Sequence, residues 1–169
     1  MTGKFITHIR NFLLLALVQV LIFSQIHLFG YATIAVYLIF LLKLPRHTTC
    51  NELLLWGFSF GLVVDMFCNT PGLNAAAATG MAFVRNMVLA TFTHKGNPDN
   101  FTPSVRSLKW GGYIVYSFIC IAIFFFILFT LELFTISNWS ALITSTLAST
   151  MATMVFAIVA ECFSRTDKA

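Results

Sequence analysis

The chain alternates between long apolar stretches and short polar links. Because a helix needs about 20 apolar residues to cross the hydrocarbon core of a bilayer, the stretches predict transmembrane helices over about residues 11–28, 31–44, 52–67, 73–92, 109–133 and 139–162. Gly30, Pro45 and the pair Pro71-Gly72 separate successive stretches, as helix-breaking residues do. The pattern therefore predicts an all-α integral membrane protein, with six transmembrane helices in a single transmembrane domain over residues 1–169.

The content and placement of charge agree with this pattern. Charged residues make up only 9% of the chain, against about 25% in a typical soluble domain. If both termini lie on one side of the membrane, that side carries nine of the ten Lys and Arg residues: Lys4, Arg10, Lys43, Arg46, Lys95, Arg106, Lys109, Arg165 and Lys168. Because basic residues retain loops in the cytoplasm, we expect a multi-pass protein with cytoplasmic N and C termini. The net charge of +4 follows from this asymmetry, so nucleic acid is not an expected partner.

Motifs typical of enzymes and of metal sites are missing from the sequence. It contains no HExxH, GxSxG or Gly-rich phosphate-binding pattern, and its four histidines are scattered through tails and links. The four cysteines form no CxxC pair and are expected to be free thiols. We therefore expect no enzymatic activity, no cofactor and no metal. The enzymatic alternative, action on a lipid-linked substrate, requires Asp65 as a catalytic base.

Two charged residues fall inside the predicted spans, where ionisable side chains are rare and need a partner or a function. Asp65 lies near the outer end of the span over 52–67, whereas Arg85 lies about 18 Å deep when counted along a helix from Leu73. This offset argues against a direct salt bridge. We instead expect Asp65 to organise the following turn or to face a partner. Arg85 is expected to bind backbone carbonyls of a neighbouring helix or to extend to the cytoplasmic interface.

Small residues line parts of the third, fourth and sixth predicted spans. Gly57 and Gly61 form a GxxxG pattern, and four consecutive alanines occur near the start of the fourth span. Small residues let membrane helices approach closely, so we expect these two spans to pack as a hairpin, with an intermolecular interface as the alternative. The Ser/Thr-rich face of 139–162 is expected to serve internal packing, with a transport path as the alternative. The Phe-rich stretch over 119–129 is expected to face lipid or another membrane protein.

One stretch carries a recognisable motif. Residues 61–75 have the sequence GLVVDMFCNTPGLNA, and together with residues 26–33 (IHLFGYAT) they resemble the rod shape-determining protein MreD family. The family's signature falls on Gly61, Asp65, Thr70, Pro71, Gly72 and Asn74, and its arginine falls on Arg85. Asn86 follows this arginine, where proline is expected. The resemblance covers essentially the whole chain, because the length and the six predicted spans also agree.

The resemblance implies a non-enzymatic role in maintaining rod shape. Proteins of this family belong to the cell-elongation complex, which carries out lateral cell-wall (peptidoglycan) synthesis at the bacterial inner membrane. They bind MreC and, through it, associate with MreB, the glycosyltransferase RodA and a penicillin-binding transpeptidase. The expected helix-packing and partner residues are Gly57, Gly61, Asp65, Thr70, Pro71, Gly72, Asn74 and Arg85.

The resemblance also implies a fold similar to the six-helix substrate-binding subunits of energy-coupling-factor transporters, and this similarity raises an alternative function. In that alternative the chain is the substrate-binding membrane subunit of a small-molecule, vitamin-type transporter. Its pocket would be lined by Gln19, Asn74, Arg85 and the Ser/Thr face of the last span. A shared architecture does not by itself show that a ligand is bound.

Overall fold

The structure, a computed structural model, describes residues 34–92, 102–133 and 139–166. These residues form the helices α2 (Leu38–Leu42), α3 (Cys50–Cys68), α4 (Leu73–Phe92), α5 (Val105–Leu133) and α6 (Trp139–Thr166). No strand occurs among them. The predicted first span, over residues 11–28, lies outside the described residues.

Four of the described helices are long and apolar enough to cross a membrane. The candidate spans are Cys50–Cys68, Leu73–Phe92, Ser107–Glu132 and Leu142–Cys162. A helix suits such stretches because it satisfies its backbone N–H and C=O groups internally, where lipid offers no partners. The all-helical, membrane-type fold expected from the sequence is therefore present over these four stretches.

Helix α2 is much shorter than the predicted second span over 31–44. It has five residues, so it rises only about 7.5 Å and does not by itself cross a bilayer. The residues at 34–37 are not in an α-helix, and Pro45 follows shortly after the helix end. All five side chains of α2 are buried, and irregular backbone at membrane depth is tolerated where protein surrounds it. This apolar segment therefore contributes to the protein core.

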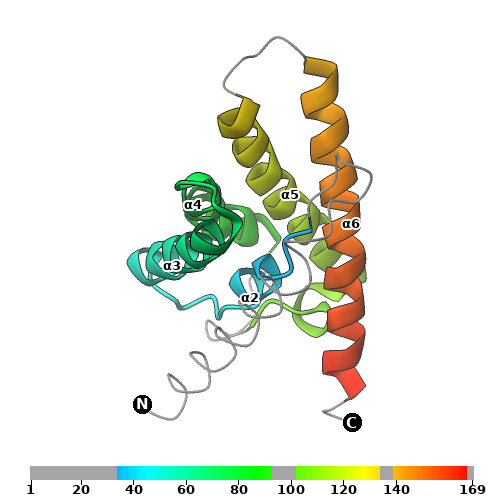
Figure 1. Cartoon of the computed structure of the whole chain (residues 1–169). Coiled ribbons are helices and arrows are strands. Elements are labelled where there is room, and N and C mark those ends of the chain that lie inside the picture. The colour runs from blue at the N-terminus through cyan, green and yellow to red at the C-terminus, as the bar shows by residue number, and fades with distance from the viewer. Residues whose placement is uncertain (1–33, 93–101, 134–138, 167–169) are drawn as a thin grey trace.

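The long helices pack in the order of the sequence. Helices α3 and α4 form a hairpin, α4 also packs against α5, and α5 packs against α6. In Figure 1 the α3–α4 pair runs across the α5–α6 pair, and α2 lies near the place where the two pairs meet. Because α2 contacts α3, α4 and α5, its buried side chains link the hairpin to the rest of the bundle.

Aromatic rings form much of the core around α2. Tyr37 stacks on Phe60 of α3 with 5.7 Å between ring centroids, and it meets Phe124 of α5 edge-on at 5.9 Å. Phe124, Phe125 and Phe129 are all buried. The expectation that the Phe-rich stretch faces lipid or a partner is therefore wrong for these side chains, although Phe126 is 50% exposed. A helix that is apolar all round does not reveal in its sequence which face is buried.

Local sequence determines where α3 begins and ends. Thr49 Oγ1 accepts a hydrogen bond from Glu52 N at 3.4 Å, and Glu52 Oε2 accepts one from Thr49 N at 3.2 Å. This reciprocal capping box satisfies N–H groups at the helix start. At the other end, Asn69 has a φ of 56° and Gly72 a φ of 81°, in the left-handed region that Asn and Gly enter most readily. The short turn between them reverses the chain and leads into α4.

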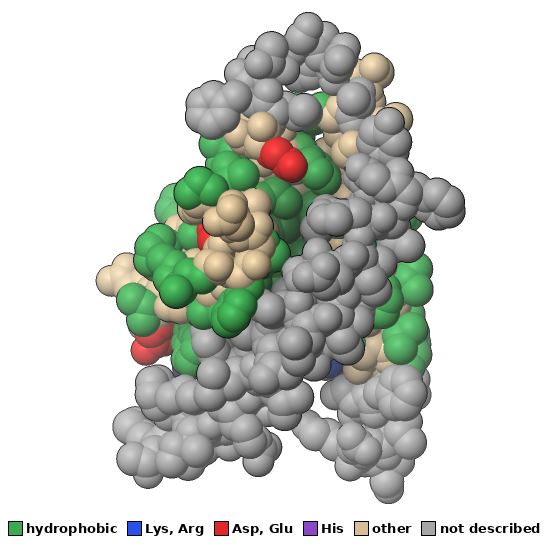
Figure 2. Space-filling model, in the orientation of Figure 1, with side chains coloured by type: hydrophobic (Ala, Val, Ile, Leu, Met, Phe, Trp, Pro, Cys, Tyr) green, Lys and Arg blue, Asp and Glu red, His purple; other side chains and the backbone are tan. Residues whose placement is uncertain are grey.

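Large apolar side chains remain exposed on α3, α4 and α6. They include Leu55, Phe58, Leu62, Met66, Phe67, Phe83, Met87, Ile143, Leu147, Met151, Val155 and Val159. Apolar side chains also dominate the described surface around the α3–α4 pair in Figure 2. Soluble monomers rarely expose large apolar patches, so these faces are suited to lipid or to other membrane helices.

Candidate functional site

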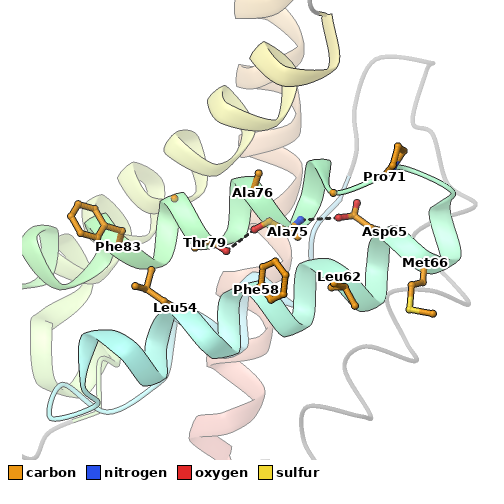
Figure 3. Close-up of a pocket in the computed structure, with 12 residues that line it drawn as sticks. Leu54, Phe58, Leu62, Asp65, Met66, Pro71, Ala75, Ala76, Thr79 and Phe83 are labelled. Atoms are coloured by element: carbon orange, nitrogen blue, oxygen red, sulfur yellow. Dashed lines mark hydrogen bonds between the residues drawn. The ribbon is translucent and has the colours of Figure 1, made fainter.

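The carboxylate of Asp65 lies in the last turn of α3 and is almost fully buried, with 6% of the residue exposed. Its Oδ1 accepts hydrogen bonds from Thr70 Oγ1 at 2.7 Å, from Asn74 N at 3.0 Å and from Asn74 Nδ2 at 3.0 Å. Its Oδ2 accepts one from Ala75 N at 2.9 Å (Figure 3). Four donors therefore compensate one buried charge, which would otherwise be costly to remove from water.

Asp65 acts as a cap for the start of α4. The first N–H groups of a helix have no acceptor within that helix, and Gly72, which precedes α4, has no side chain to offer. Asp65 supplies the missing acceptor from the end of α3, for the N–H groups of Asn74 and Ala75. The positive end of the helix dipole also favours a negative charge at this position. The geometry matches the turn-organising interpretation of Asp65.

Arg85 is fully buried in α4 and binds the end of α2. Its Nη2 donates hydrogen bonds to Leu42 O at 3.1 Å and to Leu44 O, and its Nη1 donates one to Asn86 Oδ1 at 3.1 Å. Tyr116 of α5 donates a further hydrogen bond to Leu42 O at 3.2 Å. The last carbonyls of a helix lack internal partners and carry the negative end of the dipole. Arg85 therefore caps α2, as the carbonyl-binding interpretation expected.

Asp65 and Arg85 form no salt bridge with each other. Each binds the end of another helix, Asp65 at the start of α4 and Arg85 at the end of α2. The carbonyl partners of Arg85 lie 43 and 41 residues away in the chain. Tyr116 and the two carbonyls were not found from the sequence, because no local pattern points to partners so distant.

Gly57 and Gly61 lie on the face of α3 that packs against α4. A Cβ atom on Gly61 would lie 2.5 Å from Ala75 N and 2.5 Å from Asn74 O, and it would also clash with Ala75 Cα. A Cβ atom on Gly57 would lie 2.9 Å from Ala78 O. These neighbours are backbone atoms, which cannot rotate aside. The GxxxG pattern therefore brings two helix backbones into contact, and within this chain it serves the hairpin.

These contacts join most of the motif into one unit at the end of the hairpin. Gly61 packs against Ala75, and the N–H of Ala75 binds Asp65. Asn74 also donates to Thr70 Oγ1 at 3.3 Å, so the turn is held by its own side chains. Pro71 and Gly72 are exposed in the turn, and Arg85 lies apart near α2. Since four donors already occupy the Asp65 carboxylate, the arrangement is that of a structural cap.

A groove of about 770 Å³ runs along the exposed face of the α3–α4 hairpin, which we call its outer face. Large apolar side chains of α3 line it, among them Leu54, Phe58 and Leu62, together with small residues of α4 such as Ala76 and Gly80 (Figure 3). Neither Asn74 nor Arg85 is among its lining residues. The groove is an apolar, open surface feature of the kind that lipid or a membrane helix contacts.

The polar residues expected to line a transporter pocket do not meet within the described part of the chain. Asn74 is hydrogen-bonded within the hairpin turn, and Arg85 is bound to the end of α2. In α6, Thr146 and Thr150 donate to carbonyls of their own helix. Gln19 lies outside the described residues. These described side chains therefore form hydrogen bonds within the hairpin turn, at the end of α2 and along the backbone of α6.

Side chains able to bind a metal are scattered in the described ranges. Among residues 34–92, 102–133 and 139–166, no group of three or more His, Cys, Asp or Glu side chains is placed to hold a metal ion. The cysteines Cys50, Cys68 and Cys120 are free thiols. Cys120 is buried in α5, whereas Cys50 and Cys162 are exposed.

A charged contact that sequence reasoning missed ties three segments together. Glu161 of α6 accepts a hydrogen bond from Val105 N at 3.2 Å through Oε1, and its Oε2 forms an ion pair with Lys43 Nζ at 2.8 Å. Glu161 thus caps the start of α5 and holds the link that follows α2. The available signal was the opposite charge of Lys43 and Glu161 near the same predicted membrane face. Partly exposed ion pairs contribute little energy, so this contact mainly positions the segments.

Replacing Arg85 with lysine is expected to lower the free energy of unfolding by about 2 kcal/mol. An ammonium group cannot reproduce the rigid fork with which the guanidinium reaches two carbonyls and Asn86, and each buried acceptor left unpaired costs about 1–3 kcal/mol. Unfolding of the purified protein in detergent measures the change. The matched control is Arg46→Lys in the α2–α3 link, for which a change below about 0.5 kcal/mol is expected. Equal losses in both variants would contradict the capping role of Arg85.

A scan against protein-family models, a search of curated proteins and a search of solved structures each find no match for this chain.

Proposed function

We propose that this chain is a non-enzymatic component of the bacterial cell-elongation complex, in the role of the MreD family that it resembles. It lies in the inner membrane, crosses it six times and has both termini in the cytoplasm. It binds MreC and, through MreC, positions MreB and the peptidoglycan synthases RodA and a penicillin-binding transpeptidase. Its function is to hold this assembly together and so to maintain rod shape.

The observation that supports this proposal most strongly is the shared structural role of the MreD-like residues. Gly61 and Asp65 both act on Ala75, one through close packing and the other through a hydrogen bond. Thr70 and Asn74 donate to the same Asp65 carboxylate. A chance match between this sequence and the family motif would not require the side chains of the motif to contact one another. Their cooperation makes the motif a physical unit, and the motif is what connects this chain with the family.

The exposed helix faces support a role in assembly. Lipid already solvates apolar side chains, so helices associate in membranes through close packing and interhelical hydrogen bonds. The α3–α4 hairpin is held by backbone contact and by a fully bonded cap, and its outer face carries large apolar side chains. A preorganised surface of this kind loses little conformational freedom when a partner helix binds. The membrane helix of MreC is the partner proposed here.

The placement of charge supports the proposed orientation. Lys43 and Arg46 lie in the α2–α3 link, whereas the α3–α4 turn at the opposite end of α3 carries no Lys or Arg. Basic residues are enriched in cytoplasmic links. We therefore assign the end of α3 at Cys50 to the cytoplasm and the turn at Asn69 to the outer side.

Capture of MreC tests the proposal. After co-expression of the tagged chain with MreC from the same genome, the wild-type protein is expected to retain MreC through purification from detergent. Gly61→Leu is expected to insert into the membrane but to lose most of the captured MreC, because leucine forces α3 away from Ala75. Gly111→Leu is the matched control, since an added Cβ at Gly111 meets no atom within 4 Å.

The outcomes separate the proposal from its alternative. Absence of MreC from the wild-type preparation would overturn the proposal, and equal capture by Gly61→Leu would overturn the part assigned to the hairpin. A specific ligand raises the melting temperature by mass action. Stabilisation of the purified protein by a vitamin-like compound, but not by MreC, would therefore support the transporter-subunit function instead.

A further inference from the structure

Three basic residues lie in two segments that one carboxylate joins at one end of the helix bundle. Lys43 and Arg46 lie in the link between α2 and α3, and Lys109 lies near the start of α5. The Glu161 carboxylate joins these two segments, because it binds both Lys43 Nζ and Val105 N. In Figure 1 the α2–α3 link and the start of α5 both lie toward the end of the bundle where α6 ends. We call Lys43, Arg46 and Lys109 the basic end.

Positive charge is in excess at the basic end. Glu161 pairs with Lys43, but within the described ranges no carboxylate forms an ion pair with Arg46 or Lys109. Lys109 is exposed, and Arg46 is partly exposed. Because Lys43 neutralises Glu161, this carboxylate can hold the two segments together without repelling an approaching anion. The basic end therefore presents two accessible cations on a fixed framework.

The backbone of Lys109 adopts a conformation that is rare outside glycine. Its φ of 60° and ψ of 166° interrupt α5 directly after Leu108, and such conformations carry an energetic cost in other residues. Glycines follow at positions 111 and 112, yet the strained position itself holds a lysine. Strain of this kind persists where surrounding structure enforces it, and it concentrates at functional sites. Here the break lies at Lys109, whose side chain is exposed, and the next residue, Trp110, is 44% exposed.

We propose that the basic end binds the phosphate headgroup of an anionic phospholipid. A phosphodiester is complementary in charge to Arg46 and Lys109, which pair with no carboxylate of the described residues, and clusters of basic residues beside membrane-spanning helices attract anionic lipid. Trp110 agrees with this occupant, because tryptophan is enriched at the level of the lipid headgroups. The lysine at the strained position thus contributes a charge that glycine could not. This site is separate from the hairpin and does not depend on MreC binding.

Lipid binding to the purified full-length chain, measured by native mass spectrometry, tests the proposal. Phosphatidylglycerol and phosphatidylcholine with identical acyl chains are the two probes. Arg46 and Lys109 are each expected to favour the anionic lipid by about five-fold, so the wild-type protein should prefer phosphatidylglycerol by about 25-fold. The variant carrying Arg46→Gln and Lys109→Gln should lose this preference, whereas Lys109→Arg, which keeps the charge, should retain it.

A further variant separates charge from backbone strain. Lys109→Gly removes both, so it is expected to raise the melting temperature in neutral detergent, because glycine adopts positive φ readily, and to lower the preference for phosphatidylglycerol by about five-fold. A raised melting temperature would also show that this variant is folded. Equal binding of the two lipids by the wild-type protein would overturn the proposal, as would an unchanged preference in the double variant. Full competition by inorganic phosphate would assign the site to a soluble anion and would equally overturn it.

Discussion

Replacement of Gly61 by alanine is expected to lower the free energy of unfolding by about 3 kcal/mol, the upper end of the usual cost of overpacking. The added Cβ would lie 2.5 Å from Ala75 N and from Asn74 O, and backbone atoms cannot rotate away as the end of a side chain does. Relief requires α3 and α4 to separate, which would also lengthen the hydrogen bonds between Asp65 and the start of α4. Unfolding in detergent, followed by tryptophan fluorescence, measures the effect.

Gly111→Ala is the matched control for this substitution. Both glycines lie in helices, but an added Cβ at Gly111 meets no heavy atom within 4 Å. Alanine favours a helix over glycine by about 1 kcal/mol, so this variant is expected to be as stable as the wild-type protein or more stable. Gly57→Ala, whose Cβ would lie 2.9 Å from Ala78 O, is expected to fall between the two. Equal stability of Gly61→Ala and Gly111→Ala would contradict backbone contact between α3 and α4.

Replacement of Asp65 by asparagine is expected to destabilise the protein by about 3 kcal/mol, although the two side chains have almost the same size. All four groups that bind the carboxylate are donors, two of them backbone N–H groups of α4. An amide keeps one oxygen and turns an NH2 group toward at least one of these donors. A buried donor without an acceptor costs about 1–3 kcal/mol, and the negative charge that favours the start of α4 is lost as well.

Two further variants calibrate the effect of Asp65→Asn. Glu132→Gln makes the same chemical change at an exposed position of α5, where a change below about 0.5 kcal/mol is expected. Thr70→Val removes one of the four donors and is expected to cost about 1 kcal/mol. Amide hydrogen exchange at the start of α4 should become faster in Asp65→Asn, because the cap protects those N–H groups. If Asp65→Asn is as stable as Glu132→Gln, the partner-facing interpretation of this carboxylate replaces the capping one.

These two sites have a consequence for functional experiments. Gly61 and Asp65 both act on Ala75, so substitutions at either position displace the start of α4. A loss of partner binding after such a substitution reports on the hairpin as a whole. Direct contact with a partner is better tested at an exposed side chain of the outer face, such as Phe58 or Leu62, whose removal leaves the contact between the helices intact.

The position of α2 and the burial of the Phe-rich stretch of α5 show where the apolar pattern alone was insufficient to predict the fold. The segment over 31–44 is as apolar as the neighbouring spans, yet its described part contains only the five-residue α2. Apolar composition indicates that a segment avoids water, but it does not distinguish contact with lipid from burial in protein. The same ambiguity explains the Phe-rich stretch of α5, of which Phe124 and Phe125 face the core.

The sequence by itself determined the long helices and the hairpin turn. Stretches of about 20 apolar residues favour helices in a membrane, and the Thr49–Glu52 capping box, Asn69 and Gly72 act within a few residues of the helix ends they define. Only the tertiary structure decided what the buried charges bind. The partners of Asp65 lie in the next helix and those of Arg85 more than 40 residues away, and such groups become neighbours only when helices pack. Interactions between residues close in sequence can therefore be predicted from the sequence, whereas the pairing of distant donors and acceptors depends on the fold.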